Sequence, residues 1–283
     1  MPYKKYGETF RRIREQKRLA LSSFVSIGIS KGTLSKFERG ESMMSFDKVV
    51  FALQYMGITL EEFEHFLNGY SLSESAQLLE ELKRATITQD KEMLFELSEA
   101  AEREGFHFIA LSAKCSYTSL SPNEIDDITD YLYEVTVWSY KALCIFYYTM
   151  HALATRDILH ILDFFLAKGH ELFNSEKHRN YLVQVCCRAI CILSCRKQKE
   201  SAEYILQRLD TYKLVNSMFL RNLHSITEGF WIYCFEDKLK GDTQMLKALD
   251  VFYAVSTPEI AKYYQCQYDY YVKDVPHQPL HCW

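Results

Sequence analysis

Hydrophobic residues recur at intervals of three and four along almost the whole chain, which is the spacing of amphipathic α-helices. Glycine and proline are sparse, with 10 and 5 residues among 283. Few helix breakers among many strong helix formers favour an all-α protein with short loops. No segment approaches the roughly 18 consecutive apolar residues that a membrane-spanning helix needs, so we expect no membrane partner.

The first seventy residues show the pattern of about five short helices, with apolar positions at helical spacing. The stretch "GISKGTLSKFERG" predicts a turn and then a helix that Ser30 caps and Gly40 ends. Two short helices joined by a tight turn form a helix-turn-helix, whose second helix enters the major groove of DNA. The N-terminal part of that helix meets the base edges, which selects four candidates: Lys31, Gly32, Thr33 and Lys36.

Basic and hydroxyl side chains of the same region fit contacts with phosphate. Arg11, Arg12 and Lys17 lie on the first predicted helix, where phosphate contacts position a domain without specifying sequence. Ser22 and Ser23 open the second helix, where backbone amides can meet a phosphate. The alternative is that the arginines form only a solvated face.

Charge is unevenly distributed along the chain. The first 41 residues contain ten Lys and Arg and four Glu, a balance of +6, whereas the whole chain carries −4 and the remainder therefore −10. A basic head on an acidic body is expected when one small domain binds a polyanion.

After "NGYSLSES" the chain becomes a succession of amphipathic helical segments. We expect helices at residues 74–86, 89–103, 105–117, 122–136, 138–153, 155–171, 177–196, 199–212, 215–237, 243–254 and 257–271. In "SPNEIDD", Ser121 is the expected N-cap and Glu124 completes a capping box, and Thr257 before Pro258 repeats this start signal. The stretch "KGDTQM" predicts a break at Gly241.

Helix pairs of this length, at a spacing of roughly 34–45 residues, are typical of helical repeats. No strict consensus recurs, so we expect a right-handed superhelix of degenerate helix pairs that resemble tetratricopeptide repeats. Stacked pairs leave a concave inner face, which is where such proteins bind extended ligands. The predicted organisation is a helix-turn-helix domain at residues 1–68, a linker at 69–73 and a repeat domain at 74–283.

The predicted recognition helix resembles that of the Xre/Cro-like helix-turn-helix domains. Their usual pattern is Ser-x-x-x-[Ile/Leu]-Ser-[Arg/Lys]-[Phe/Ile/Trp]-Glu-x-Gly. Seven positions match it in order: Ser30, Leu34, Ser35, Lys36, Phe37, Glu38 and Gly40. The resemblance implies a five-helix Cro-like fold in which Arg14 and Glu38 form a buried structural ion pair. The chain departs from the pattern at "LSSF", where many phage repressors have a glutamine.

A Cro-like head on a degenerate repeat body resembles the Rgg/GadR/MutR regulators of streptococci and their relatives. In the body, the resemblance rests on "LDVFYAVSTPEIAKYYQCQYDYYV" and on six residues of the central helix pair, namely Asp127, Thr129, Asp130, Tyr131, Leu132 and Trp138. This family implies a cytoplasmic, homodimeric transcription factor that binds double-stranded DNA. Many members bind a short, largely hydrophobic signalling peptide on the concave face, in quorum sensing. We expect helices near Phe230 to Tyr264 to contribute to the dimer interface.

The segment "NYLVQVCCRAICILSC" is apolar on almost every side, yet it carries Gln184 and Arg188 one turn apart. A buried unpaired guanidinium costs several kcal/mol, so Arg188 needs either a partner such as Asp157 or Asp163, or a cavity with a polar ligand. In the family an amide side chain near this place holds the peptide backbone, a role that suits Gln184 and Arg188. An aromatic stripe completes the expected peptide contacts, which are Gln184, Arg188, Tyr147, Tyr148, His151 and Cys191.

Motifs of an enzyme, a metal site or a cofactor site are missing from the sequence, which has no HExxH, Gly-rich phosphate loop or G-x-S-x-G. The nine cysteines include no Cys-x-x-Cys pair and fit reduced thiols that pack as small apolar residues. We therefore expect no enzyme, no metal and no cofactor. Two alternatives stay open: a regulator that responds to redox or pH instead of a peptide, and a helical-repeat interaction protein whose head is structural.

Overall fold

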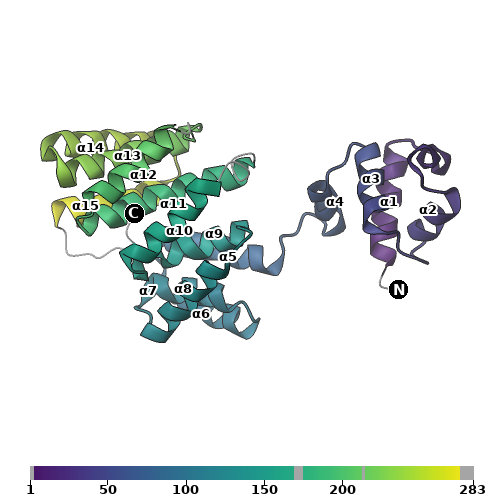
Figure 1. Ribbon diagram of the computed structural model, residues 1–283, viewed down its shortest axis with the longest axis horizontal. Coiled ribbons are helices and arrows are strands. Elements are labelled where there is room, and N and C mark those ends of the chain that lie inside the picture. Colours follow the sequence, from purple (N-terminus) through teal and green to yellow (C-terminus); the bar gives the residue numbers. More distant parts are fainter. Residues whose placement is uncertain (1–2, 169–174, 212–213, 275–283) are drawn as a thin grey trace. The chain divides into compact units, whose positions relative to one another are not determined.

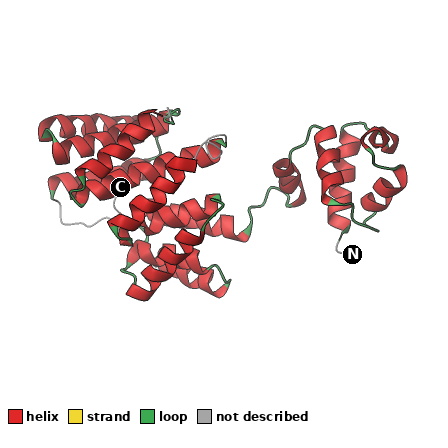
Figure 2. Ribbon diagram, viewed as in Figure 1, coloured by secondary structure: helices red, strands yellow, loops and turns green. Residues whose placement is uncertain are grey.

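The computed structural model describes residues 3–168, 175–211 and 214–274. Within these ranges every regular element is a helix and no strand occurs, as Figure 2 shows, so the predicted all-α class is confirmed. The chain divides into two compact units, Met1–Ser73 and Glu74–Trp283, which we call the head and the body. No helix among the described residues is long and apolar enough to cross a membrane.

The head contains four α-helices and one 3₁₀ helix in its described part. In chain order they are α1 (Lys4–Gln16), η1 (Leu21–Ile27), α2 (Lys31–Glu38), α3 (Phe46–Tyr55) and α4 (Leu60–Leu67). Three aromatic side chains, Phe10, Phe24 and Phe37, fill its centre, and each is at most 1% exposed. Their ring centroids lie 5.5–6.0 Å apart in tilted and edge-on arrangements, which favour aromatic pairs. This core fixes α1, η1 and α2 against one another.

The ends of α2 follow the sequence signals. Ser30 is the N-cap, and its Oγ accepts a hydrogen bond from the backbone N–H of Thr33 at 3.1 Å. Gly40 has φ +70°, and its N–H donates to the carbonyl of Phe37 at 2.8 Å. A side chain at Gly40 would also press on the backbone of Lys4, because a Cβ there would lie 2.7 Å from that Cα. Glycine is therefore required at this helix end.

The body consists of helices joined by short connections (Figure 1). They are α5 (Glu74–Thr88), α6 (Lys91–Arg103), α7 (His107–Tyr117), α8 (Pro122–Glu134), α9 (Tyr140–Thr149), η2 (Met150–Ala152), α10 (Thr155–Lys168), α11 (Glu176–Cys195), α12 (Lys199–Thr211), α13 (Met218–Phe235), α14 (Lys238–Val255) and α15 (Pro258–Lys273). The expected capping box is formed at α8 by Ser121 and Glu124. At α15, Thr257 is the N-cap but makes no side-chain cap bond.

The predicted break at Gly241 is wrong. Helix α14 runs through this residue without interruption, and Gly241 is buried. The glycine is needed for packing, because a Cβ there would lie 2.5 Å from the carbonyl oxygen of Gly229 on α13. Helices α13 and α14 therefore approach closely and lie side by side, as Figure 1 shows.

Helices α7, α9, α11 and α13 of the body pack against one another in this order, and we call this row the inner layer. Helix α15 contacts α5. The central helix of this layer is α11, where every residue from Val185 to Ser194 is buried. Two helices about 180 residues apart in sequence, α5 and α15, are thus in contact.

Candidate functional site

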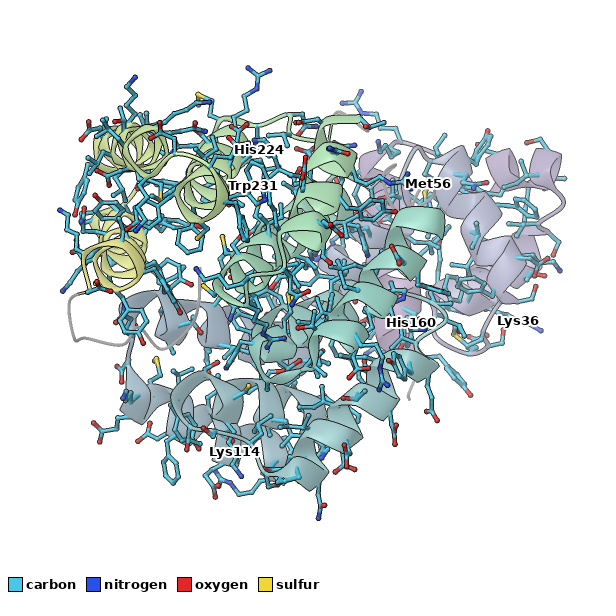
Figure 3. All side chains as sticks on the ribbon, turned by 60° about the vertical axis from the view of Figure 1, so that its left-hand side comes forward. Lys36, Met56, Lys114, His160, His224 and Trp231 are labelled. Atoms are coloured by element: carbon cyan, nitrogen blue, oxygen red, sulfur yellow. The ribbon has the colours of Figure 1, made fainter. Side chains whose placement is uncertain are left out.

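The outward face of α2 is made of small and cationic residues. Leu34, Phe37 and Glu38 are buried against the head, whereas Lys31, Gly32 and Lys36 are exposed. Figure 3 shows Lys36 at the surface of the head. Such a face can enter the major groove of DNA, where ammonium groups reach guanine or phosphate oxygens.

Thr33 differs from the other three residues that are predicted to contact bases. It is only partly exposed, and its hydroxyl lies 2.9 Å from the hydroxyl of Ser30. The side chain thus takes part in the N-terminal capping of α2, so its hydroxyl is less available to hydrogen-bond a base than the sequence predicts.

The ion pair implied by the family resemblance is present. Arg14 Nε and Nη2 donate to the two carboxylate oxygens of Glu38 at 2.6 and 2.8 Å, and Nη1 donates to the carbonyl of Leu19 at 2.7 Å. Both side chains are buried, and the hydrogen bonds that Arg14 donates to Glu38 raise the pKa of Arg14. This bidentate pair ties α1 to the C-terminal end of α2 and so sets the position of the recognition helix.

The three basic residues expected at phosphate are all exposed on or just after α1. Arg11 pairs with Glu15 at 2.8 Å within the helix, and Arg12 Nη2 donates to the carbonyl of Phe66 at 3.4 Å. Lys17 is the C-cap residue of α1. Exposed pairs of this kind are worth little and are easily exchanged for a phosphate.

The expectation for Ser22 and Ser23 needs a correction. Both lie in η1, a 3₁₀ helix of seven residues rather than an α-helix. The N–H of Ser23 donates to the carbonyl of Ala20 at 3.0 Å, so this amide already has a partner. The hydroxyl groups of both serines can still donate to a phosphate, whereas the Ser23 amide is already bonded at the start of η1.

The body contains a cavity of about 420 Å³ on the inner layer. Side chains from five helices or helix starts line it: Lys83, Thr86, Ile87, Tyr147, Tyr148, Asn180, Tyr181, Gln184, Ser217, Phe219, Leu220, Ile260, Tyr263 and Tyr264. Aromatic and aliphatic groups form most of the wall, with two amides and one ammonium group as the strongest polar groups. A site of this volume and composition suits a few residues of a largely apolar chain.

Three of the predicted peptide contacts line this cavity, namely Gln184, Tyr147 and Tyr148. The lining residues from α5, the start of α13 and α15 were not among those predicted from the sequence. Lys83, Thr86 and Ile87 share one face of α5 by their spacing of three and four, which is the only signal that could have identified them. Nothing in the sequence indicates that this face meets Tyr263 and Tyr264 of α15.

Arg188 does not line the cavity. Its side chain is 1% exposed, and its guanidinium carbon lies 4.6 Å from the centroid of the Tyr147 ring. Of the two expected acidic partners, Asp157 accepts a hydrogen bond from Tyr133 at 2.6 Å and Asp163 is exposed. Arg188 therefore lies behind the wall of the cavity, where it supports Tyr147 by a cation–π contact.

His151 and Cys191 are also absent from the lining, which corrects the sequence-based site. Cys191 is 0% exposed, in the core of the body. His151 is partly buried, and its Nε2 lies 3.5 Å from the thiol of Cys115. Burial and then the charge of Arg188 lower the pKa of His151 to about 3, so this imidazole is neutral near pH 7. A histidine with this pKa cannot sense pH in the neutral range.

The buried thiols are unsuited to redox chemistry. Burial raises the pKa of Cys115 and Cys187 to about 12 and that of Cys144 to about 11. A thiol with such a pKa carries almost no thiolate near pH 7, and the thiolate is the reactive form. Among the described cysteines, only Cys195, Cys234 and Cys266 are partly exposed.

Comparisons with known proteins agree on one fold. The chain aligns with Streptococcus dysgalactiae SHP pheromone receptor Rgg2 at 20% identity and TM-score 0.75, over 95% of this chain and 100% of that one. A Listeria monocytogenes EGD-e protein gives 18% identity and TM-score 0.77 over 98% and 100%. Bacillus thuringiensis PlcR, solved with the peptide PapR7 and DNA, gives 15% identity and TM-score 0.66 over 93% and 98%.

The match to a sequence family is more specific than these structural likenesses. Residues 72–266 match the C-terminal domain of the HTH-type transcriptional regulator Rgg, which is more than half of the chain. The chain therefore belongs to the Rgg family of helix-turn-helix transcriptional regulators.

Proposed function

We propose that this protein is a cytoplasmic, homodimeric regulator whose head binds a promoter operator and whose body binds a short, largely hydrophobic signalling peptide. The observation that carries the peptide part is the apolar cavity on the inner layer of the body. The family is one of transcriptional regulators and not of enzymes. In this scheme the peptide is the quorum signal and promoter activity is the response.

The exposed face of α2 supports DNA binding by the head. Lys31 and Lys36 bring two ammonium groups to a helix that the Arg14–Glu38 pair holds in place. PlcR, which has the same fold at 15% identity, is described in complex with DNA. A positive face on a rigid helix is what phosphate and base-edge contacts require.

The DNA-binding proposal is tested with the double variant Lys31→Ala/Lys36→Ala. Both side chains are exposed, so the variant should fold with an unchanged melting temperature. We expect it to lose promoter binding in an electrophoretic mobility assay, while the matched variant Lys91→Ala/Lys141→Ala, at two exposed lysines of the body outside the cavity lining, binds as the wild type does. Promoter binding retained by the double variant would contradict the proposal and favour a structural head.

The composition of the cavity supports a peptide with a carboxylate. Among the residues that the structure describes, Lys83 is the only charged one in the lining, and it takes part in none of their ion pairs. Asn180 and Gln184 can hold a peptide backbone, since an amide offers both a donor and an acceptor. Tyrosines around them provide the apolar surface for aliphatic or aromatic side chains.

The peptide proposal is tested by screening a library of short hydrophobic peptides against the purified chain by isothermal titration. For a binder, we expect Lys83→Glu to reduce affinity at least about tenfold, because a like charge then faces the carboxylate. Arg84→Glu, one residue further along α5 and outside the lining, is the control with the same charge change. Failure of every peptide to bind would favour a regulator without a peptide.

An exposed apolar stripe on α14 supports the homodimer. Leu239, Leu246 and Tyr253 follow at intervals of seven and are 77%, 40% and 56% exposed. This spacing keeps side chains on one face, as in helices that pair with a second helix. Leu239→Glu/Tyr253→Glu should convert the dimer into a monomer in light scattering, and an unchanged mass would exclude this stripe from the interface.

A further inference from the structure

Gly32 occupies the most outward position of α2. It and Lys36 stand two residues before and two after Leu34, which is 0% exposed. Two residues correspond to roughly 200° around a helix of 3.6 residues per turn, so both face almost directly away from the core. One of the two positions that face farthest from the core thus has no side chain.

The head itself does not require a glycine there. Gly32 is absent from the glycines of positive φ among the described residues. A Cβ built on it would meet only the Oγ of Ser30 at 3.9 Å, an ordinary van der Waals contact. By contrast, Gly40, just after the C-terminal end of the same helix, has both a positive φ and a crowded Cβ. Alanine at position 32 would fit the fold, and it is the better helix former.

Since the fold leaves room for a side chain at position 32, we look for the reason in what α2 binds. The neighbouring residues on this face of α2 indicate which group the missing side chain accommodates. Thr33 and Ser35, on the flanks, are partly buried, and their hydroxyls contact Ser30 and Arg39. The central line of the face belongs to Gly32 and Lys36, which would lie over the base edges and not over the phosphates. Among base edges in the major groove, the 5-methyl of thymine is the apolar group that needs space and not a donor or acceptor.

We infer that Gly32 is a specificity-determining residue, whose bare Cα receives the methyl group of one thymine in the operator. This inference rests on the proposed DNA binding by the head. In the complex, Lys36 lies one helical turn further along α2 and contacts the neighbouring base pair. The absence of a Cβ at position 32 allows α2 to approach the DNA closely.

The test adds one methyl group to the protein and removes one methyl group at a time from the DNA. The operator is first selected from a random DNA library with the full-length wild-type chain. Wild type and Gly32→Ala are then measured on this operator, and on versions in which each thymine in turn is replaced by deoxyuridine, which lacks the 5-methyl group.

On the selected operator, we expect Gly32→Ala to bind roughly tenfold more weakly, the scale of one mismatched base pair. A single deoxyuridine position should restore the variant to near wild-type affinity, and the same replacement should weaken the wild type. The other thymine positions serve as internal controls. The melting temperature of Gly32→Ala should equal or exceed that of the wild type.

Three outcomes would overturn the inference: equal affinity of both proteins for the operator, a weakened variant that no deoxyuridine restores, or a lower melting temperature of Gly32→Ala. The second outcome would mean that the glycine accommodates the sugar-phosphate backbone. If the wild type selects no sequence at all, the proposed DNA binding itself fails, which distinguishes that result from the other three.

Discussion

The guanidinium carbon of Arg188, a side chain that is 1% exposed, lies 4.6 Å from the centre of the Tyr147 ring. Tyr147 in turn lines the cavity of the body, whereas Arg188 does not. The charge that stands out in the sequence thus contacts an aromatic side chain of the cavity wall and is not itself part of the lining. His151 is close enough to Arg188 for this charge to lower its pKa.

Arg188→Met should raise the pKa of His151, because it removes a nearby positive charge that disfavours the imidazolium. Burial is the larger cause of the low value of about 3, so the pKa in the variant should still lie below 6.5. An NMR titration of the His151 ring resonances measures the change. Methionine keeps an apolar chain of similar length, and Lys199→Met, on the surface of α12, controls for general charge loss. No change of the His151 pKa in Arg188→Met would contradict the electrostatic contact.

His151 should make the body less stable in acid. Its folded pKa of about 3 lies below the ordinary value of 6.5, so between these values the unfolded chain binds one proton more than the folded chain. The free energy of unfolding therefore rises with pH in this window, by up to about 1.4 kcal/mol per pH unit, and the contribution is complete above pH 6.5. Urea unfolding at a series of pH values should show a shallower slope for His151→Gln than for the wild type. Equal slopes would show that His151 titrates normally.

Removing only the Glu38 carboxylate should destabilise the head more than replacing both members of the Arg14–Glu38 pair. Glu38→Ala leaves a buried guanidinium without its carboxylate, a loss of about 3–5 kcal/mol. The double variant Arg14→Met/Glu38→Leu removes both charges and should recover part of this loss. Thermal unfolding of the full-length chain, followed together with operator binding, compares the two. A double variant that is less stable than Glu38→Ala would contradict this prediction. The ion pair would then stabilise the head by more than the mutual neutralisation of two buried charges.

Gly241→Ala should loosen the contact between α13 and α14, although alanine favours a helix. Its Cβ would lie 2.5 Å from the carbonyl oxygen of Gly229, so the two helices must separate, at a cost of about 1–3 kcal/mol. Gly32→Ala is the matched control, since a Cβ there has 3.9 Å to its nearest neighbour. Calorimetry of both variants should show a lower melting temperature only for Gly241→Ala.

The helices and the ends of several of them could be predicted from the sequence. Apolar spacing and capping signals are local, and they act within one or two turns, as Ser30, Gly40 and Ser121 illustrate. The Arg14–Glu38 pair followed from a family pattern with fixed spacing. Gly241 shows the limit of local signals. From the sequence alone a glycine inside a helix predicts a break, and only the position of the neighbouring helix explains why glycine is needed there.

Only the tertiary structure decided which residues form the cavity. Its wall combines α5 with α9, α11, the start of α13 and α15, and this combination depends on contacts between segments far apart in the chain. Sequence spacing placed Gln184 and Arg188 on one side of α11, but it could not tell how far each lies from the cavity. Burial of a charge depends on the helices packed around it, and so Arg188 contacts Tyr147 outside the cavity lining while Lys83 lies within the lining.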